Sequence, residues 1–216
     1  DIGAFEQVTP ERVAALRARW QVGEEAGTIF LHPARLTRWK GQALSVEAAR
    51  LLREGSTEKF TLLLAGDAQG RDNYAAEIEN AIADAGLGPH ARVVGHCDDM
   101  PAAYALADAV LSPSITPFGR TAVEAQAASR PVIVSDTGGQ QETVLDGQTG
   151  FRVAPNDAAA LCGAMARVIA LGPKARAEMG GRGHENAATH YSVGAMCEAT
   201  LGIYARLLAA RRTSRS

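Results

Sequence analysis

Residues 108–136 read DAVLSPSITPFGRTAVEAQAASRPVIVSD, and this stretch decides the fold class. DAVLSPS and RPVIVSD are short apolar runs with β-branched residues, as buried strands are. The segment between them, GRTAVEAQAAS, has helical spacing. A strand, a helix and a second apolar strand in this order indicate a βαβ unit of a parallel sheet.

The same alternation of short apolar runs and longer helical segments continues through most of the chain. The apolar runs span residues 28–35, 59–67, 91–96, 108–114, 130–136 and 150–155. Short apolar strands separated by helices belong to a parallel sheet that is covered on both faces. We therefore predict an α/β fold, a Rossmann-like doubly wound parallel sheet of about six strands with extra C-terminal helices.

Composition limits the function classes. The chain has 216 residues and a formal net charge of −2, so no overall basic field indicates a nucleic-acid partner. Its 3 cysteines include no CxxC pair, which argues against a disulfide framework or a zinc site and favours a reducing compartment such as the cytoplasm. No apolar run approaches the roughly 20 residues of a transmembrane helix.

Three parts of the chain are predicted. Residues 1–27 contain an amphipathic helix, and we interpret them as a linker from an N-terminal domain outside this sequence. Residues 28–190 form the Rossmann-like domain. Residues 191–216 form a C-terminal helix and a frayed basic end. Apolar side chains recur along that helix at helical spacing, so this stripe is expected to be exposed or to form a dimer contact.

Ligands of doubly wound sheets bind beyond the carboxyl ends of the strands, so the loops there are the candidate site. Arg35 and Lys40 lie in the first of these loops, and Gly41 follows them at the start of a helix. Arginine can bind phosphate oxygens with two parallel hydrogen bonds, and lysine adds a point charge. Taken alone, this loop is also compatible with an ordinary solvated surface.

The fourth loop, SPSITPFGR, places a glycine and little side-chain cover where a strand gives way to a helix. Backbone N–H groups at a helix start carry partial positive charge, and glycine lets a ligand approach closely. We therefore expect an anion here. Glu124, further into the same helix, can accept hydrogen bonds from sugar hydroxyls, or it can simply complement the helix dipole.

The order of these loops resembles that of a known family. ARLTRWKG, LLLAGDAQGRDNY, VVGHCDDMPAAYALADAVLSPS and PFGRTAVEAQAASRPVIVSDTGGQQETV follow one another at the family's spacing. The chain is similar, from about residue 28 to residue 208, to the C-terminal, donor-binding domain of group 1 retaining glycosyltransferases with the GT-B fold. The resemblance implies binding of a nucleotide diphosphate sugar that carries UDP, GDP or ADP.

The resemblance also implies roles for particular residues. Arg35 and Lys40 match the pair that binds the diphosphate and stabilises it as a leaving group. Cys97 matches a position that reads the base through its main chain. Glu124 matches the second acid of the family's E-x7-E motif, which binds the ribose. Backbone amides would face the diphosphate and the sugar from four consecutive residues, Phe118, Gly119, Arg120 and Thr121.

One position departs from the family. The first acid of the E-x7-E motif would stand at Thr116, whose hydroxyl can hydrogen-bond a sugar but brings no negative charge. No DxD arrangement is present, so we expect no metal ion and no other cofactor. Basic side chains and amides would offset the phosphate charge instead.

The resemblance leads to a functional hypothesis with two alternatives. The chain would be the donor-binding half of an enzyme that transfers a hexose, with retained configuration, to a polysaccharide or a lipid-linked acceptor. Without its N-terminal acceptor domain it would be inactive. It would act in the cytoplasm, or peripherally at the inner face of the cytoplasmic membrane. The alternatives are an isomerase similar to UDP-sugar 2-epimerases, and a non-catalytic nucleotide-sugar-binding module, which Thr116 would permit.

Overall fold

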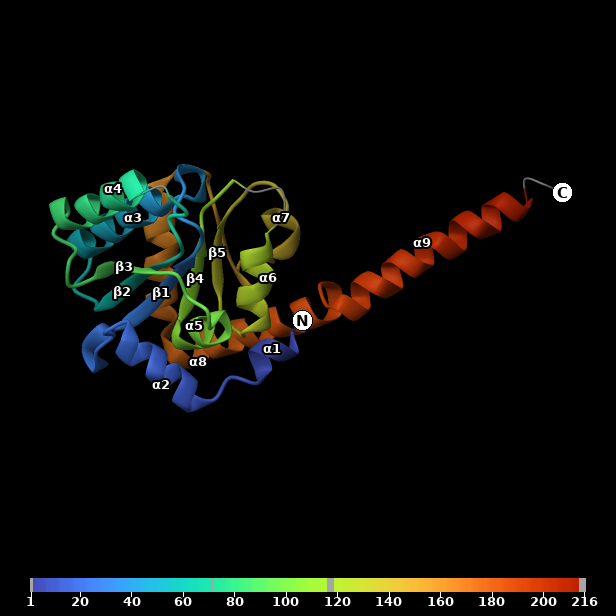
Figure 1. Ribbon diagram of the computed structural model, residues 1–216, viewed down its shortest axis with the longest axis horizontal. Helices are drawn as coiled ribbons and strands as arrows, with labels where there is room; N and C mark the ends of the chain where they lie inside the picture. Colours follow the sequence, from blue (N-terminus) through green and yellow to red (C-terminus); the bar gives the residue numbers. More distant parts are fainter. Residues whose placement is uncertain (1, 71, 116–118, 214–216) are drawn as a thin grey trace.

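The structure, a computed structural model, describes residues 2–70, 72–115 and 119–213 (Figure 1). Within these residues, 6 parallel strands form one sheet in the order β3-β2-β1-β4-β5-β6. The strands are β1 (Thr28–Pro33), β2 (Phe60–Ala65), β3 (Ala91–Gly95), β4 (Ala109–Ser112), β5 (Val132–Ser135) and β6 (Gly150–Val153). The predicted Rossmann-like parallel sheet is confirmed.

Among the described residues, two helices precede β1, and each strand from β1 onward is followed by a helix, as the periodicity predicted. They are α1 (Gly3–Glu6), α2 (Pro10–Arg19), α3 (Gln42–Gly55), α4 (Asp72–Asp84), α5 (Met100–Leu106), α6 (Arg120–Ala127), α7 (Gln140–Thr143), α8 (Ala158–His190) and α9 (Val193–Thr213). Short 3-10 turns lie at Glu24–Ala26 and Arg38–Lys40.

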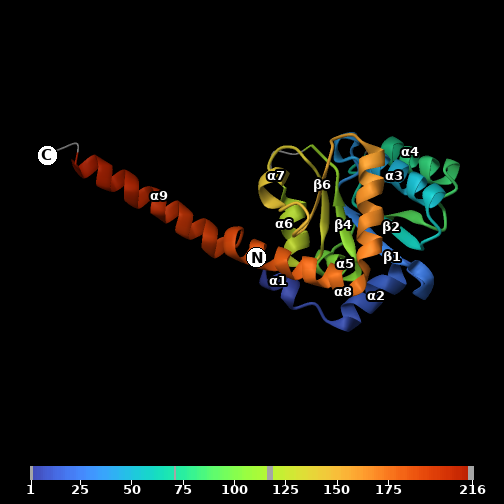
Figure 2. The same ribbon diagram turned by 180° about the vertical axis from the view of Figure 1, so that it is seen from behind.

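The sheet is the middle of three layers (Figures 1 and 2). Successive strand residues point to opposite faces, so Leu62 and Leu64 join a core with α3, α4 and α8, whereas Leu63 joins a core with α2, α5 and α6. Both cores are built mainly from fully buried aliphatic side chains. This two-sided burial explains why the strand sequences are apolar throughout and not alternating.

The order in which strands are added to the sheet reverses at β1. Strands β2 and β3 are added on one side of β1, and β4, β5 and β6 are added on the other. Leu31 of β1 is paired with Leu63 of β2 and with Val110 of β4. The loops after β1 and β4 therefore diverge from neighbouring strands, and they leave a crevice at the carboxyl ends of the strands.

The described part of residues 1–27, which begins at residue 2, is part of this packing. Leu16, Trp20 and Val22 are buried in the core on the α5 side of the sheet. Arg12 of α2 pairs with Asp99, at 2.6 Å between Nη2 and Oδ1, and Asp99 also caps α5. That these residues lead in from a further domain stays a prediction, and within the structure α2 belongs to the body.

The helical spacing of residues 157–171 corresponds to the first part of α8. Strand β6 is followed by α8, which breaks at Gly172, where φ is 69° and ψ is 171°, and resumes at Pro173. Proline at the first position of a helix is favourable because its missing N–H would be unpaired there. Within Ala158–Ala209, one window of 18 residues reaches a mean hydropathy of 1.2 and is long and apolar enough to span a membrane. The first part of α8, however, packs in the core through Leu161 and Met165.

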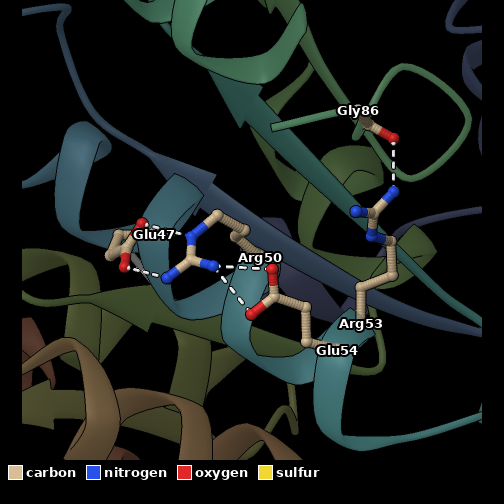
Figure 3. Close-up of polar contacts among 5 residues, drawn as sticks. All are labelled: Glu47, Arg50, Arg53, Glu54 and Gly86. Atoms are coloured by element: carbon tan, nitrogen blue, oxygen red, sulfur yellow. Dashed lines mark hydrogen bonds and ion pairs between the residues drawn. The ribbon is translucent and has the colours of Figure 1, made fainter. Parts of the chain in front are cut away.

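The outer face of α3 carries a chain of polar contacts (Figure 3). Arg50 lies between Glu47 and Glu54 and pairs with both, at 2.7 and 2.6 Å. Such exposed pairs add only a few tenths of a kcal/mol each to helix stability. Arg53 donates a hydrogen bond of 2.9 Å to the carbonyl oxygen of Gly86, so α3 is also tied to the turn after α4.

Helix α9 extends away from the body in both views (Figures 1 and 2). Its apolar side chains are exposed, as the sequence predicted for the stripe. Those more than 45% exposed are Val193, Met196, Leu201, Ile203, Tyr204, Leu207 and Leu208.

Candidate functional site

A cleft of about 570 Å³ lies at the carboxyl ends of the strands. Its walls come from the loops that follow β1, β2, β3 and β4, and from the start of α6. The cleft is therefore located at the crossover between β1 and β4, where doubly wound sheets bind their ligands.

Every predicted site residue that the structure describes lines this cleft. These residues are Arg35, Lys40, Cys97, Gly119, Arg120, Thr121 and Glu124. The other two, Thr116 and Phe118, lie outside the described residues. Loops that are up to about 90 positions apart in the chain thus meet at one place, which the spacing of the sequence motifs alone could not establish.

The loop after β1 brings two cations to the cleft. Arg35 Nη1 donates to Oε1 of Gln69, at 3.2 Å, from the loop after β2. The ammonium of Lys40 lies 4.2 Å from the ring centroid of Trp39. Burial, followed by the nearby charges of Arg35 and Arg120, lowers the pKa of Lys40. The three cations repel one another, and a bound anion would reduce this repulsion.

Glycines let the loops approach one another beneath this site. A Cβ atom on Gly66 would lie 1.9 Å from the carbonyl oxygen of Ala34, so the loops after β1 and β2 touch through their backbones. Gly41, with φ of 82°, starts α3 in the left-handed region, and it lies against Pro113 of the loop after β4. Any side chain at Gly66 would push Arg35 away from its present place.

The start of α6 forms the opposite wall. Gly119 is the N-cap, so the first N–H groups of α6 have no partner within the helix. Glu124, one turn in, accepts a hydrogen bond of 2.8 Å at Oε2 from the Tyr104 hydroxyl, and its Oε1 lies 3.2 Å from Nε of Arg120. Burial is the main cause that raises the pKa of Tyr104, which therefore stays a donor at neutral pH.

The loop after β3 provides the remaining wall. Cys97 is 6% exposed, and burial raises the pKa of its thiol. The thiol is therefore protonated at neutral pH, which suits a role through the main chain and not through a thiolate. His96 is exposed, and its Nε2 lies 2.9 Å from Oδ1 of Asp98.

Sequence reasoning missed two contributors to the cleft. Tyr104 was read only as part of a helix, yet its hydroxyl orients Glu124. A tyrosine among small apolar residues could have been a signal, because a buried tyrosine hydroxyl needs a partner. Gln69, which holds Arg35, carried no signal that separates it from an ordinary loop residue.

Within the described ranges, no group of three or more histidine, cysteine, aspartate or glutamate side chains could hold a metal ion. The positive charge that the cleft presents comes from Arg35, Lys40 and Arg120. The expectation that the site uses no metal or cofactor stays a prediction.

Comparisons with known proteins agree with this geometry. The family model of glycosyl transferases group 1 matches residues 16–186. The D-inositol 3-phosphate glycosyltransferase of Acidothermus cellulolyticus is 31% identical over 208 residues, which are 92% of this chain and 45% of that protein. The 2-deoxystreptamine glucosyltransferase of Streptomyces kanamyceticus is 31% identical over 166 residues, 76% of this chain and 42% of that protein.

Solved structures show the same fold. A glycosyltransferase from Rickettsia africae has a TM-score of 0.88 at 29% identity, and the match covers 96% of this chain and 55% of that one. Anabaena Alr3699/HepE in complex with UDP has a TM-score of 0.84 at 26% identity, with 95% and 55% covered. The chain spans less than half the length of these curated relatives and about half of these solved chains.

The family model covers most of the chain, including all four loops that form the cleft. The structural matches cover the sheet and its flanking helices together. This chain belongs to the group 1 glycosyl transferases.

Proposed function

We propose that this chain is the donor-binding half of a retaining glycosyltransferase that takes a hexose from a nucleotide diphosphate sugar. The observation that carries the proposal is the convergence of Arg35, Lys40 and Arg120 on one cleft that also contains Glu124 and the start of α6. The complex of Alr3699/HepE with UDP, a relative of the same fold, supports a uridine nucleotide as the first candidate.

In this proposal the diphosphate is the leaving group. As the bond to the sugar breaks, negative charge grows on the diphosphate, and fixed cations and N–H groups stabilise that charge most effectively in a site that excludes water. Arg35 and Lys40 would neutralise it from the loop after β1, and the amides at the start of α6 would do so from the other wall. Such a site catalyses mainly by holding the donor and stabilising its departing group.

The other end of the donor would lie between Glu124 and the loop after β3. The Tyr104 hydroxyl donates to Oε2 of Glu124, which fixes the carboxylate and leaves its acceptor capacity for ribose hydroxyls. The backbone around Cys97 would hydrogen-bond the base. A role of Thr116 and Phe118 toward the donor sugar stays part of the proposal, and the threonine would replace the acid of related enzymes.

The acceptor is proposed to bind to a separate N-terminal domain of a longer protein. This chain spans 45% of the Acidothermus cellulolyticus relative, which leaves room for such a domain. The exposed stripe of α9 would be covered by it, and this chain alone would be inactive. A second copy of this chain could cover the stripe instead. Sedimentation of this chain tests that alternative, because it would detect a stable dimer.

The acceptor is proposed to be a polysaccharide or a lipid-linked saccharide, and the enzyme to work in the cytoplasm or at the inner face of the cytoplasmic membrane. The near-neutral net charge of −2 gives this chain little attraction of its own for an anionic membrane. Membrane contact would therefore come from the remainder of the protein. Fractionation of cells that make the longer protein would test this assignment.

The test is a calorimetric titration of this chain with UDP, GDP and ADP. We expect one nucleotide to bind, and Arg35→Ala combined with Lys40→Ala to weaken its binding at least about 100-fold, because hydrogen bonds between charged groups contribute about 1.5–3 kcal/mol each. Arg38→Ala is the matched control. Arg38 lies in the same loop but pairs with Glu77 at 2.7 Å and does not line the cleft. Equal affinity of the double variant and the wild type would refute the diphosphate site.

A further inference from the structure

Two buried polar side chains lie beneath the loop that carries Arg35 and Lys40. His32, in β1, is 1% exposed, and Gln42, the first residue of α3, is 0% exposed. Neither is among the described residues that line the cleft. A buried polar side chain destabilises a fold unless it is hydrogen-bonded, so the partners of these two side chains show what they hold in place.

Gln42 holds the beginning of the loop. Its Nε2 donates to the carbonyl oxygen of Arg35 at 2.9 Å and to that of Ala34 at 3.3 Å. Its Oε1 lies 3.4 Å from the hydroxyl of Tyr74, on α4. One amide side chain thus joins the start of α3 to the backbone of the residue that carries the first cation.

His32 holds the end of the loop. Its Nδ1 lies 2.9 Å from Oγ of Ser45, on α3. The N–H of Ser45 in turn donates to the carbonyl oxygen of Gly41, at 3.0 Å, and a contact of the ring with the backbone of Lys40 opposes the effect of burial on the pKa of His32. The imidazole is therefore a bridge between a buried strand, the first turns of α3 and the backbone of the second cation.

We propose that His32 and Gln42 are positioning residues for the donor site, with His32 acting through Lys40 and Gln42 acting through Arg35. The inference rests on the proposed function, because it assigns these two side chains to the proposed diphosphate site.

The physical advantage is preorganisation. Arginine and lysine have long flexible side chains, and ordering such a side chain on binding costs about 0.5–1.5 kcal/mol. A fixed backbone at both cations removes the further cost of ordering the loop. Supporting hydrogen bonds from buried neighbours are a usual way to keep binding groups within a fraction of an ångström of the productive geometry.

The inference predicts a specific pattern in double-mutant cycles. The measurement is calorimetric titration of this chain with UDP, and the same titrations are repeated with GDP and ADP. We expect His32→Leu to weaken binding about tenfold in the wild-type background and less than about twofold in the Lys40→Ala background. Gln42→Leu should behave in the same way with Arg35→Ala.

The crossed pairs are the control. His32→Leu with Arg35→Ala, and Gln42→Leu with Lys40→Ala, should retain most of each single effect, because each anchor holds a different cation. Additive effects in the matched pairs would overturn the inference, since a general loss of packing weakens binding whichever cation is present. Leucine is chosen because both positions are buried and leucine removes every hydrogen-bonding group of the side chain.

A gentler variant covers the case in which leucine at position 32 prevents folding. Ser45→Ala removes only the hydroxyl that meets the ring of His32. It should weaken UDP binding about threefold, and this effect should vanish in the Lys40→Ala background. Persistence of the Ser45→Ala effect in that background would overturn the role of His32.

The two proposals fail in different ways. If Arg35→Ala and Lys40→Ala each bind the nucleotide as tightly as the wild type, the proposed diphosphate site is wrong and the inference is overturned with it. If both variants bind weakly and the cycles are additive, the site stands and only the positioning role is overturned. His32→Gln, which keeps a donor and an acceptor, should bind more tightly than His32→Leu if the bridge matters.

Discussion

The loop after β1 and helix α9 differ in how regular their backbones are and in how many tertiary contacts hold them. Residues 34–41 have little regular structure, yet Gln42 donates hydrogen bonds to the carbonyl oxygens of Ala34 and Arg35, and Leu36 within the loop is 2% exposed. Helix α9 is regular over 21 residues, yet its large apolar side chains are 47–64% exposed.

The difference shows that regularity and stability are separate properties. A loop is rigid when other elements satisfy its polar groups and cover its apolar ones. Most of the stability of a helix in a protein comes from tertiary packing of its apolar face, and backbone hydrogen bonds alone add little. Other residues of this chain therefore supply the contacts that hold the loop. By contrast, α9 presents an apolar surface that the described residues do not cover.

The same substitution at two leucines tests this contrast most strongly. Leu36→Ala should destabilise the domain by about 2–5 kcal/mol, because it removes a buried side chain and leaves a cavity. Leu201→Ala, at 64% exposure, should change the free energy of unfolding by less than about 0.5 kcal/mol. Urea unfolding of both variants is the measurement. Similar losses at the two sites would mean that α9 packs on the domain in solution.

The free energy of unfolding should depend on pH through His32, which lies beneath the loop after β1. Burial lowers the pKa of His32 from 6.5 to about 4. Between these values the unfolded chain takes up a proton that the folded chain does not, so the contribution of His32 is complete above pH 6.5 and is lost as the pH falls to about 4. The loss amounts to about 3 kcal/mol.

The measurement is urea unfolding of the wild type and of His32→Leu between pH 7 and pH 4. We expect the stability of the wild type to fall more steeply than that of the variant over this range. Parallel curves would show that the ring is solvated and not held in the buried bridge.

Removal of α9 should have the smallest effect. A chain ending at Ser192 loses a helix whose large apolar side chains are exposed, so its thermal midpoint should stay within about 2 °C of that of the full chain. Nucleotide affinity should also be unchanged, because no residue of α9 that the structure describes lines the cleft. A drop of 5 °C or more would show that α9 contributes to the domain.

Most of the fold could be predicted from local patterns. Apolar runs such as FTLLLA and AVLS indicated strands, and the helical segments between them indicated a parallel sheet. The break in α8 coincides with Gly172 and Pro173, and local patterns did not indicate that the helix beyond it packs on the body through Met179 and Ala187.

The site could be predicted only in part. Arg35, Lys40 and Glu124 could be predicted because they follow strands at the carboxyl edge of the sheet and match the order of a known family, although each alone was also compatible with an ordinary surface role. The partners of these groups did not stand out. Gln42 and Tyr104 lie on helices, where a polar tip is ordinary, and their roles depend on which distant backbone or carboxylate the fold brings within 3 Å. Sequence spacing carries no information on such distances.

The break at Gly172 and Pro173 also has a mechanical consequence. Beyond it, α8 passes so close to the turn after α6 that a Cβ atom on Gly180 would lie 2.0 Å from the carbonyl oxygen of Ser129. This contact fixes the direction in which the chain leaves the body. Helix α9, with 21 residues, is about 30 Å long, so a tilt of about 10° at its base would move its tip by about 5 Å. A small change at the contact of Gly180 is therefore magnified along α9. Gly180→Ala, which adds a single methyl group, would change the direction of the far end of the helix.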